Sequence, residues 1–178
     1  MMVSGKEEQS QHNVYDILFG MSSIYTVLTD LQIPFEKYTH PAVHTVVDTI
    51  EHYKNIDAGR CKNLFLQNVK GDTYYLIVMQ ADKRLDIKKL SATLETKLRF
   101  ASEEKLLHYL GLTPGSVSPF GLINDTDHSV RVIVDKDVLN HQKVSFHPNI
   151  NTETLVISSE DLQKFLTSVG NPITYFPL

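Results

Sequence analysis

The sequence predicts an α+β domain with a mixed, mostly antiparallel β-sheet flanked by helices. Strand-like and helix-like segments are interspersed, but they lack the regular βαβ alternation that builds a parallel sheet. The 178 residues have the length of one domain, and no repeat, linker or low-complexity stretch divides them. We therefore expect a flexible tail over residues 1–13 and a single domain over residues 14–178.

The first predicted elements are two helices and an edge strand. Apolar residues recur at steps of three and four over residues 14–31, which predicts a helix that packs one face on the core. Residues 33–38 contain Pro34, and because proline cannot donate to a ladder they predict a short strand at a sheet edge. Residues 45–53 have helical spacing and predict a second, short helix.

A hairpin and two further helices follow. Residues 62–69 and 73–80 are rich in β-branched and aromatic residues and surround a turn centred on Gly71, which predicts an antiparallel hairpin. Residues 86–98 carry apolar side chains at helical spacing. Ser102 is a favourable N-cap for the next helix, which Gly111 should end.

The last third of the chain predicts a loop, four strands and a helix. Residues 112–120 contain two prolines and a glycine and predict the loop. Ser159 is placed to cap the last helix, over residues 160–169. The four short strands are predicted over residues 121–123, 129–134, 144–146 and 152–157.

The composition, with 42% hydrophobic and 21% charged residues, is that of a soluble globular protein. No apolar run approaches the roughly 20 residues of a membrane-spanning helix, and the polar N-terminal residues lack a secretory pattern. We therefore expect a cytoplasmic protein without a membrane partner. Cys61 is the single cysteine, which excludes an internal disulfide and a cysteine-based zinc cage.

The formal charge of -4 argues against indiscriminate binding to nucleic acid, and we expect no DNA partner. Basic residues nevertheless crowd into residues 83–99 and give a locally positive surface. They are Lys83, Arg84, Lys88, Lys89, Lys97 and Arg99. Such a run is either a solvated helix face or a site for an anionic partner, of which RNA is one candidate.

The eight histidines do not show the spacing of a metal site. His40 and His44 are four residues apart, but Pro41 would begin a helix rather than continue one, and no glutamate lies between them as in a zinc-binding helix. His147 differs from the others because it ends a predicted strand just before Pro148. Its ring could point into a pocket, or it could be a structural turn histidine.

Two neighbouring residues at the start of the predicted hairpin are candidates for chemistry. Cys61 lies between Arg60 and Lys62, whose charges would lower the pKa of the thiol, but no base or oxyanion hole in the sequence accompanies it. Lys62 opens an apolar strand, from which its ammonium could reach a phosphate or a carboxylate. The alternative for Lys62 is a solvated charge at a strand edge.

A G-x-x-x-P pattern is the remaining candidate. It consists of Gly115, Ser116, Val117, Ser118 and Pro119. Glycine lets the backbone approach a ligand closely, so that successive N–H groups could point at a carbonyl or phosphate oxygen. The pattern also fits an ordinary connection between two elements.

Several of these motifs occur together in an order that resembles a known family. The motifs are Lys62-Asn63, the stretch from Gly111 to Leu122, Phe146-His147-Pro148-Asn149, Asn151-Thr152, His40-Pro41-Ala42-Val43 and residues 98–104. As an ensemble over about residues 15–170, they resemble the stand-alone prolyl-tRNA editing proteins of the YbaK and prolyl-tRNA synthetase-associated domain family, and its alanyl-specific branch in particular.

The resemblance implies the editing-domain fold and a deacylase activity. The substrate would be mischarged tRNA(Pro), from which the protein would hydrolyse the ester between alanine and the 3′-terminal ribose. Prolyl-tRNA synthetase is a further candidate partner. A synthetase pocket sized for proline cannot strongly reject a smaller amino acid, because each missing methylene contributes only about 1–3 kcal/mol, so a second hydrolytic step is needed.

The resemblance also implies roles for individual residues. Lys62 matches the key functional lysine of the family, and Asn63 matches the asparagine that supports it. We expect Lys62 to grip the terminal phosphate, and the N–H groups of the Gly115–Pro119 loop to stabilise the oxyanion or to fix the attacking water. His147 matches the histidine associated with the aminoacyl group, and we expect it to position that group. No metal or cofactor is implied, because an aminoacyl ester is already activated and the vicinal ribose hydroxyl can assist.

Three alternatives remain open at the level of sequence. The same fold could act on cysteine or another small amino acid esterified to the same tRNA. It could instead be a non-catalytic module that binds tRNA or a partner protein. Without regard to fold, a small metal-dependent hydrolase could use the histidines, and bound zinc would support that alternative.

Overall fold

The computed structural model describes residues 23–42 and 56–178. The predicted tail, the start of the first predicted helix, the helix predicted over residues 45–53, and His44 lie outside these residues.

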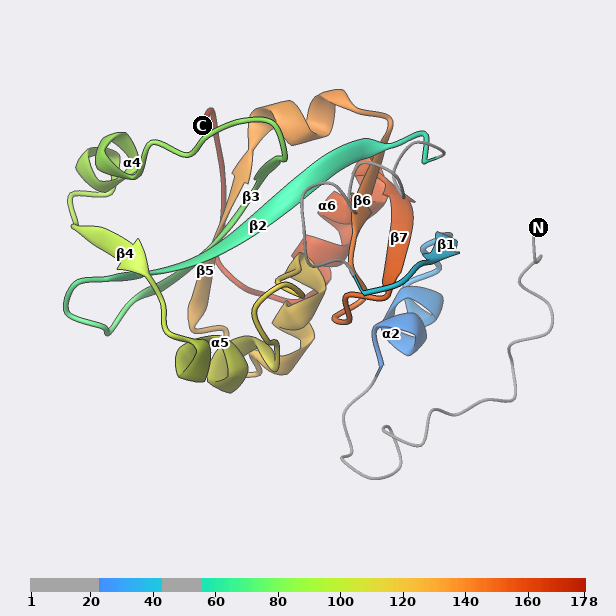
Figure 1. Ribbon diagram of the computed structural model, residues 1–178, viewed down its shortest axis with the longest axis horizontal. Coiled ribbons are helices and arrows are strands. Elements are labelled where there is room, and N and C mark those ends of the chain that lie inside the picture. The colour runs from blue at the N-terminus through green and yellow to red at the C-terminus, as the bar shows by residue number, and fades with distance from the viewer. Residues whose placement is uncertain (1–22, 43–55) are drawn as a thin grey trace.

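Eight strands form one mixed sheet in the order β1-β7-β6-β2-β3-β5-β8, and β4 pairs with β2 beside this path (Figure 1). The strands are β1 (Glu36–Thr39), β2 (Gly59–Asn68), β3 (Tyr74–Gln80), β4 (Leu98–Phe100), β5 (Val130–Asp135), β6 (Lys143–Phe146), β7 (Glu153–Ser158) and β8 (Ile173–Phe176). In the described part of the chain, β1–β7, β6–β7, β2–β3 and β2–β4 are antiparallel, and β2–β6, β3–β5 and β5–β8 are parallel. The predicted α+β class with a mixed, mostly antiparallel sheet is confirmed.

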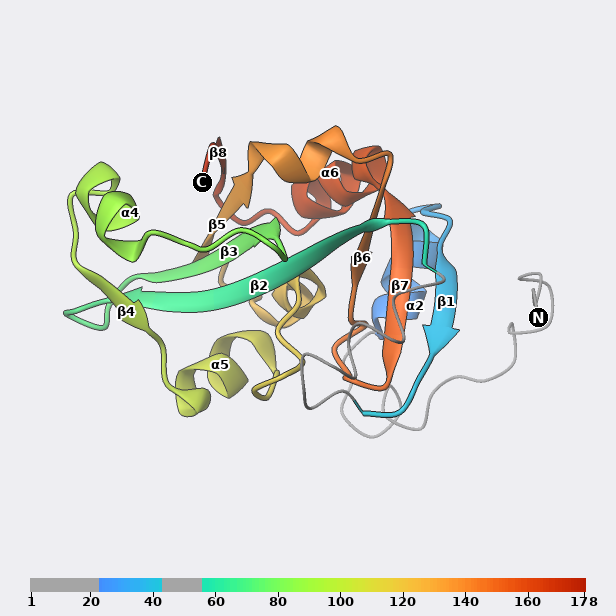
Figure 2. The same cartoon turned by 45° about the horizontal axis from the view of Figure 1, so that its top comes forward.

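Helices cover the two faces of this sheet unequally. The α-helices are α2 (Ile24–Asp30), α4 (Ile87–Thr93), α5 (Glu103–Leu110) and α6 (Ser159–Ser168), and the 3-10 helices are η1 (Pro119–Asn124) and η2 (Lys136–Asn140). Figure 2 shows α4 and α5 on opposite sides of β2. Apolar residues of α2, α5 and α6 join one core, whereas α4 packs on a second core.

The side-chain alternation of β2 and β3 separates the two cores. Phe65 and Val78 belong to the core of α2, α5 and α6, which we call the α5 side. Leu66 and Met79 belong to the core of α4, which we call the α4 side. Successive side chains of a strand point to opposite faces, so neighbouring residues of β2 face different cores.

Several predicted elements are confirmed. The hairpin forms as β2 and β3 around Gly71, which has a φ of 78°. In α5, Ser102 accepts the N–H of Lys105, and Gly111 ends the helix with a φ of 64°. That left-handed conformation favours glycine. The predicted strand pair near the C-terminus forms as β6 and β7, and β1 lies at the sheet edge, just after Pro34.

Three predicted elements were wrong in extent or type. The helix predicted over residues 86–98 ends at Thr93, because Glu95 adopts a φ of 52° and residues 98–100 pair with β2 as β4. The strand predicted over residues 121–123 is η1, which Pro119 begins and Ser118 caps. The helix predicted from residue 14 does not run unbroken to residue 31, because Ser23 is extended and caps α2. The prediction also missed β8 and η2.

Candidate functional site

The middle of β2 has an open edge. On the side away from β3, β6 pairs with β2 only at Gly59 and Arg60, and β4 pairs only with residues 66–68. Between these two pairings, the one backbone bond made by the described residues on that side is from the Ala101 N–H to the Phe65 carbonyl, 3.0 Å away. Lys62 and Asn63 both lie in this open stretch.

Asn63 ties the predicted loop to the strand. It lies opposite Val78, so its side chain is on the α5 side of β2. Its Nδ2 donates to the carbonyl oxygen of Val117 at 2.9 Å. Its Oδ1 is buried and has no hydrogen-bond partner. The structure therefore brings Asn63 together with the G-x-x-x-P loop, on the opposite side of β2 from Lys62, and leaves a buried acceptor at the contact.

The loop itself presents only some of its backbone donors. Gly115 has a φ of 88°, is exposed, and has open space where a Cβ would lie. The N–H and the Oγ of Ser116 both donate to the carbonyl of Thr113, at 3.1 and 2.8 Å. Pro119 has no N–H. The N–H groups of Gly115, Val117 and Ser118 donate to none of the residues that the structure describes. Ser118 is fully buried, whereas Gly115 is exposed and Val117 half-buried, so Gly115 and Val117 have the N–H groups that the loop can offer a ligand.

Close aromatic packing fixes the segment that follows the loop. Phe120 on η1, Phe146 on β6 and Phe165 on α6 are fully buried. The ring of Phe120 meets the ring of Phe146 edge-on at 5.8 Å and that of Phe165 edge-on at 5.1 Å. Such edge-to-face pairs are favourable. They hold η1 against the strand that leads directly to His147.

His147 lies in the connection between β6 and β7, and its environment favours the neutral ring. Its Nδ1 donates to the carbonyl of Glu153 at 2.8 Å. Burial lowers the pKa of His147, the hydrogen bond to Glu153 opposes that effect, and the nearby His40 lowers the pKa further. The rings of His40 and His147 are 5.8 Å apart. A neutral ring with a proton on Nδ1 has an acceptor at Nε2.

Asn149 is a site candidate that the sequence names only as part of a motif. Its Nδ2 donates to the carbonyl of Phe120 at 3.3 Å, and its Oδ1 is buried without a partner. Its φ of 65° is left-handed, a conformation that asparagine tolerates better than most residues. The segment from Val117 to Phe120 is therefore anchored at both ends by asparagine amides, and both amides have unpartnered oxygens.

Lys62 lies on the opposite side of β2 from the loop. Its register partner is Met79, which is on the α4 side. Its Nζ donates to the carbonyl of Ala81 at 3.1 Å and to the carbonyl of Lys83. The structure thus does not place the ammonium beside the loop, because β2 lies between them. An ammonium has three donors, and no described residue accepts the third.

The environment of Cys61 contradicts one expectation. The cationic neighbours in sequence predicted a lowered pKa, but burial raises the pKa of the thiol to about 12. The half-buried side chain packs against the α5-side core. A thiol in this state is a poor nucleophile.

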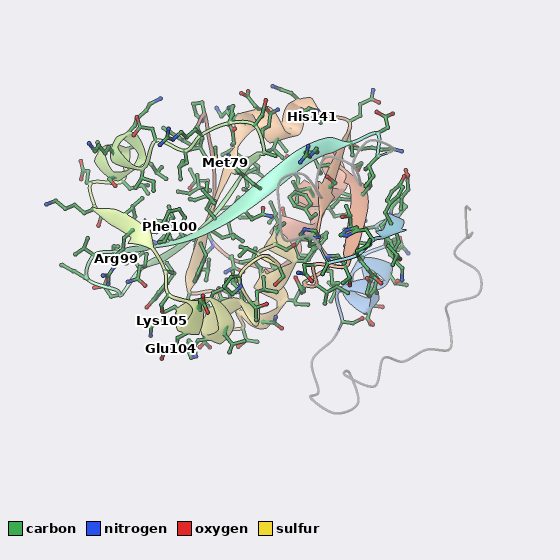
Figure 3. All side chains as sticks on the ribbon, viewed as in Figure 1. Met79, Arg99, Phe100, Glu104, Lys105 and His141 are labelled. Atoms are coloured by element: carbon green, nitrogen blue, oxygen red, sulfur yellow. The ribbon has the colours of Figure 1, made fainter. Side chains whose placement is uncertain are left out.

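A polar cleft of about 400 Å³ lies where β2 and β4 meet α5. Its lining includes Gln67, Arg99, Phe100 and Lys105, and Figure 3 shows Arg99 and Phe100 on β4 near Lys105 on α5. The Phe100 side chain is 59% exposed. Arg99 lies opposite Gln67, on the α5 side with Lys105, whereas Phe100 lies opposite Leu66, so its ring is on the α4 side. Two cationic groups at one cleft can contact the phosphates of a nucleic acid.

The described residues contain neither a metal-binding cluster nor a membrane-spanning helix. Among residues 23–42 and 56–178, no group of three or more histidine, cysteine or acidic side chains is arranged to hold a metal ion. No helix in the same residues is long and apolar enough to cross a membrane.

Comparisons with known proteins point to one family. Residues 40–165 match the model of the aminoacyl-tRNA editing domain. The chain is 40% identical over 154 residues to the prolyl-tRNA editing protein ProX of Acetoanaerobium sticklandii, an alignment that covers 84% of this chain and 92% of that protein. It is 33% identical over 149 residues to prolyl-tRNA synthetase associated domain-containing protein 1 of Bos taurus, covering 81% of this chain and 86% of that protein.

A solved structure assigned as a candidate trans-editing enzyme for prolyl-tRNA synthetase has a similar fold. It superposes with a TM-score of 0.63 at 20% identity and covers 81% of this chain and 87% of that one. At this identity the likeness concerns the fold alone.

Proposed function

The chain belongs to the aminoacyl-tRNA editing domain family, and from this premise we propose that it is a trans-editing deacylase that removes alanine from mischarged tRNA(Pro). The reaction adds water to the ester carbonyl, breaks the bond between that carbon and the ribose oxygen, and returns a proton to the ribose oxygen. The products are alanine and tRNA with a free 3′ end.

The observation that carries this proposal is the anchored loop. Asn63 and Asn149 hold the segment from Val117 to Phe120 at both ends, beside the turn of His147. The N–H group of Val117 in this anchored segment, with that of Gly115 just before it, is then a donor for the oxygen that becomes negative when water attacks the ester. Fixed donors are effective because they need no reorganisation during the reaction, and one such donor contributes about 10²–10³ in rate.

Lys62 and the open edge of β2 suggest how the 3′ end lies. The ammonium has one donor left for a phosphate oxygen, while the loop lies on the other side of the strand. A terminal nucleotide placed across the open edge would have its phosphate toward Lys62 and its ester toward the loop. The backbone of β2 in this stretch has few protein partners, so an RNA strand can approach it closely.

The polar cleft is placed to hold the tRNA further from its 3′ end. Gln67 lines the cleft and lies four residues beyond Asn63 on the same side of β2, which is about 13 Å along a strand. That distance corresponds to about four stacked nucleotides. Arg99 and Lys105 can contact phosphates there. The contact should weaken with salt, as expected for a few phosphate contacts.

His147 is assigned to positioning of the aminoacyl group. Because its ring is held neutral, Nε2 can accept a hydrogen bond from the α-ammonium of the amino acid. The same geometry would suit cysteine, which is close to alanine in size, so cysteinyl-tRNA(Pro) is the second candidate substrate. A pocket distinguishes such small side chains only weakly.

The test is hydrolysis of alanyl, cysteinyl and prolyl esters on tRNA(Pro), with chelator present. We expect rapid loss of alanine, slower loss of cysteine and none of proline, and no dependence on the chelator. Lys62→Ala should reduce the rate by about 100-fold or more, whereas Lys143→Ala, a matched change at a surface ion pair, should not change it. If no ester is hydrolysed, the protein is a binding module rather than a deacylase.

A further inference from the structure

The ammonium of Lys62 is held by a turn, not by an acid. The two carbonyls that accept its hydrogen bonds belong to Ala81 and Lys83, in the turn that follows β3. The N–H of Ala81 donates to the carbonyl of Arg60 at 2.9 Å and fixes the start of the turn to β2. The position of the ammonium therefore depends on how firmly the rest of this turn is held.

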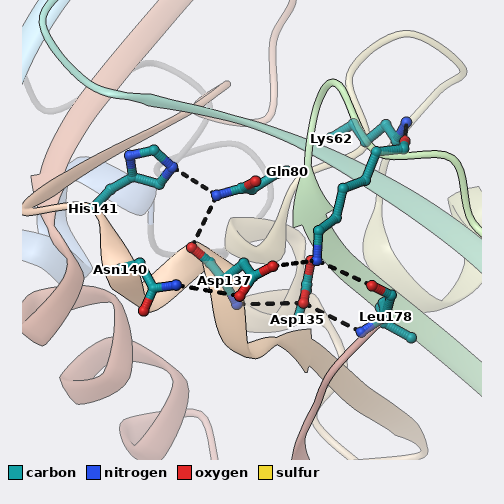
Figure 4. Close-up of polar contacts among 8 residues, drawn as sticks. Lys62, Gln80, Asp135, Asp137, Asn140, His141 and Leu178 are labelled. Atoms are coloured by element: carbon teal, nitrogen blue, oxygen red, sulfur yellow. Dashed lines mark hydrogen bonds and ion pairs between the residues drawn. The ribbon is translucent and has the colours of Figure 1, made fainter.

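The side chain of Lys83 anchors the end of that turn, and all three of its donors are in use. Figure 4 shows three of the residues around it, Asp135, Asp137 and Leu178. Nζ donates to Asp135 at 2.7 Å, contacts Asp137 at 2.6 Å, and donates to the main-chain oxygen of Leu178 at 3.0 Å. The hydrogen bonds to Asp135 and Asp137 raise the pKa of Lys83. An ammonium has three donors, so this group is saturated and its orientation is fully determined.

The acceptors are themselves fixed. The side chain of Asp135 is completely buried, and its second oxygen accepts the N–H groups of Asp137 and Leu178, each at 3.3 Å. Just before the turn, Gln80 donates through Nε2 to the carbonyl of Asp137 at 3.0 Å. Both ends of the turn are therefore tied to the segment where β5 runs into η2.

We infer that Lys83 is a positioning residue for Lys62: with Asp135 and Asp137, it sets the two carbonyls that fix the Lys62 ammonium on the α4 side of β2. The inference rests on the proposed function, in which Lys62 contacts the substrate. It assigns Lys83 to the site although its own charge is neutralised by protein carboxylates and does not reach the RNA.

The decisive variant is Lys83→Arg, which keeps the charge but replaces a three-donor ammonium with a planar fork. A planar guanidinium cannot reach Asp135, Asp137 and the Leu178 oxygen in the same geometry, so the turn should shift. We expect the single-turnover deacylation rate to fall about tenfold, as for residues of one hydrogen-bonded network, with little change in KM. In a Lys62→Arg background the same change should reduce the rate by less than about twofold, because the two residues act through one contact.

A second measurement does not depend on activity. In the wild-type protein, NMR should detect a Lys62 ammonium whose protons exchange slowly because two of them are hydrogen-bonded. Lys83→Arg should remove that signal, and Lys143→Arg, a matched change in a surface pair, should preserve it. If Lys83→Arg does not fold, Asp137→Asn removes one charged partner from the half-exposed side of the cluster and should reduce the signal and the rate by about two- to threefold.

The outcomes separate the two proposals. An unchanged Lys62 signal in a folded Lys83→Arg protein overturns the inference, whatever the activity. Equal rate losses in the wild-type and Lys62→Arg backgrounds also overturn it, because Lys83 would then be merely structural. If the wild-type protein hydrolyses no ester, the proposed function fails, and the NMR signal alone decides whether Lys83 positions Lys62.

Discussion

The two sides of β2 at residues 62 and 63 are built in opposite ways. On the α4 side, the Lys83 ammonium uses all three donors, and both oxygens of the buried Asp135 carboxylate accept hydrogen bonds. On the α5 side, Asn63 and Asn149 each donate to the loop segment but bury an amide oxygen that has no partner.

The difference separates a supporting structure from a binding surface. A buried polar atom without a partner costs about 1–3 kcal/mol, so two in one contact are a considerable burden on folding. Unpaired buried groups in native proteins call for an explanation, and one explanation is a ligand or water that completes the contact. The saturated α4 side holds a cation in place, and the incomplete α5 side is where we expect a substrate donor to bind.

The largest effect should be on stability, when the Lys83 ammonium on the α4 side is removed. Lys83→Met leaves the Asp135 carboxylate buried without its cation, and we expect a loss of about 3 kcal/mol in the free energy of unfolding. This is the lower end for a broken buried pair, because a quarter of the Lys83 side chain is exposed. Urea unfolding measures it. Lys143→Met, which breaks an exposed pair with Glu36, should change the midpoint little, and equal losses in the two variants would contradict the comparison.

The next effect concerns the incomplete side, and it should appear in rate rather than stability. Asn149→Gly removes the amide that anchors Phe120 but suits the left-handed φ of 65°. We expect the deacylation rate to fall about tenfold or more, since small misplacements in a site are costly, with no fall in Tm. His128→Gly, a change at a similar φ of 51° in an exposed turn, is the control. A lower Tm with an unchanged rate would make Asn149 structural.

How far the sequence predicts this molecule depends on whether a signal is local. The hairpin turn at Gly71 and the helix from Ser102 to Gly111 were predicted well because their turn and capping residues act within a few positions. Leu98 continues an apolar helical spacing, yet it pairs with β2, a tertiary contact that overrides the local pattern. The 3-10 helix η1 is likewise fixed by packing of Phe120 on two distant rings.

The same division holds for the candidate site. The resemblance to a family placed Asn63 and the loop in one site, and the structure brings them together. The position of Lys62 on the α4 side follows from strand alternation once the register is known. Its hydrogen bond to Ala81, however, joins residues that are 19 positions apart in the sequence. The anchoring by Asn149 spans 29 residues, and no spacing in the sequence indicates such a contact.

A smaller effect is expected from pH, through His147. Burial lowers its pKa below the usual value of about 6.5. Above that value the ring is neutral in both the folded and the unfolded chain, so stability is unaffected. As the pH falls below it, the unfolded chain binds the proton first, and the folded state loses stability until the pH passes the lowered pKa.

His147→Gln removes this titration while keeping an N–H that can donate to the carbonyl of Glu153. The wild-type protein should therefore lose more Tm than the variant between about pH 7 and pH 5. Equal losses of Tm in the two proteins would show that His147 has the same pKa in the folded and the unfolded chain.

The smallest effect on the deacylation rate should come from replacing Cys61. Cys61 precedes Asn63 by two residues on the same side of β2, so a reactive thiol there would supply a nucleophile beside the loop. Burial raises its pKa to about 12, which leaves about one thiolate in ten thousand at pH 8. Cys61→Ala should therefore change the deacylation rate by less than about twofold, and the native protein should resist thiol reagents. A tenfold loss of rate would mean that the Cys61 thiolate attacks the ester carbonyl. An unchanged rate agrees with water as the nucleophile, which is the reaction that we propose for the loop.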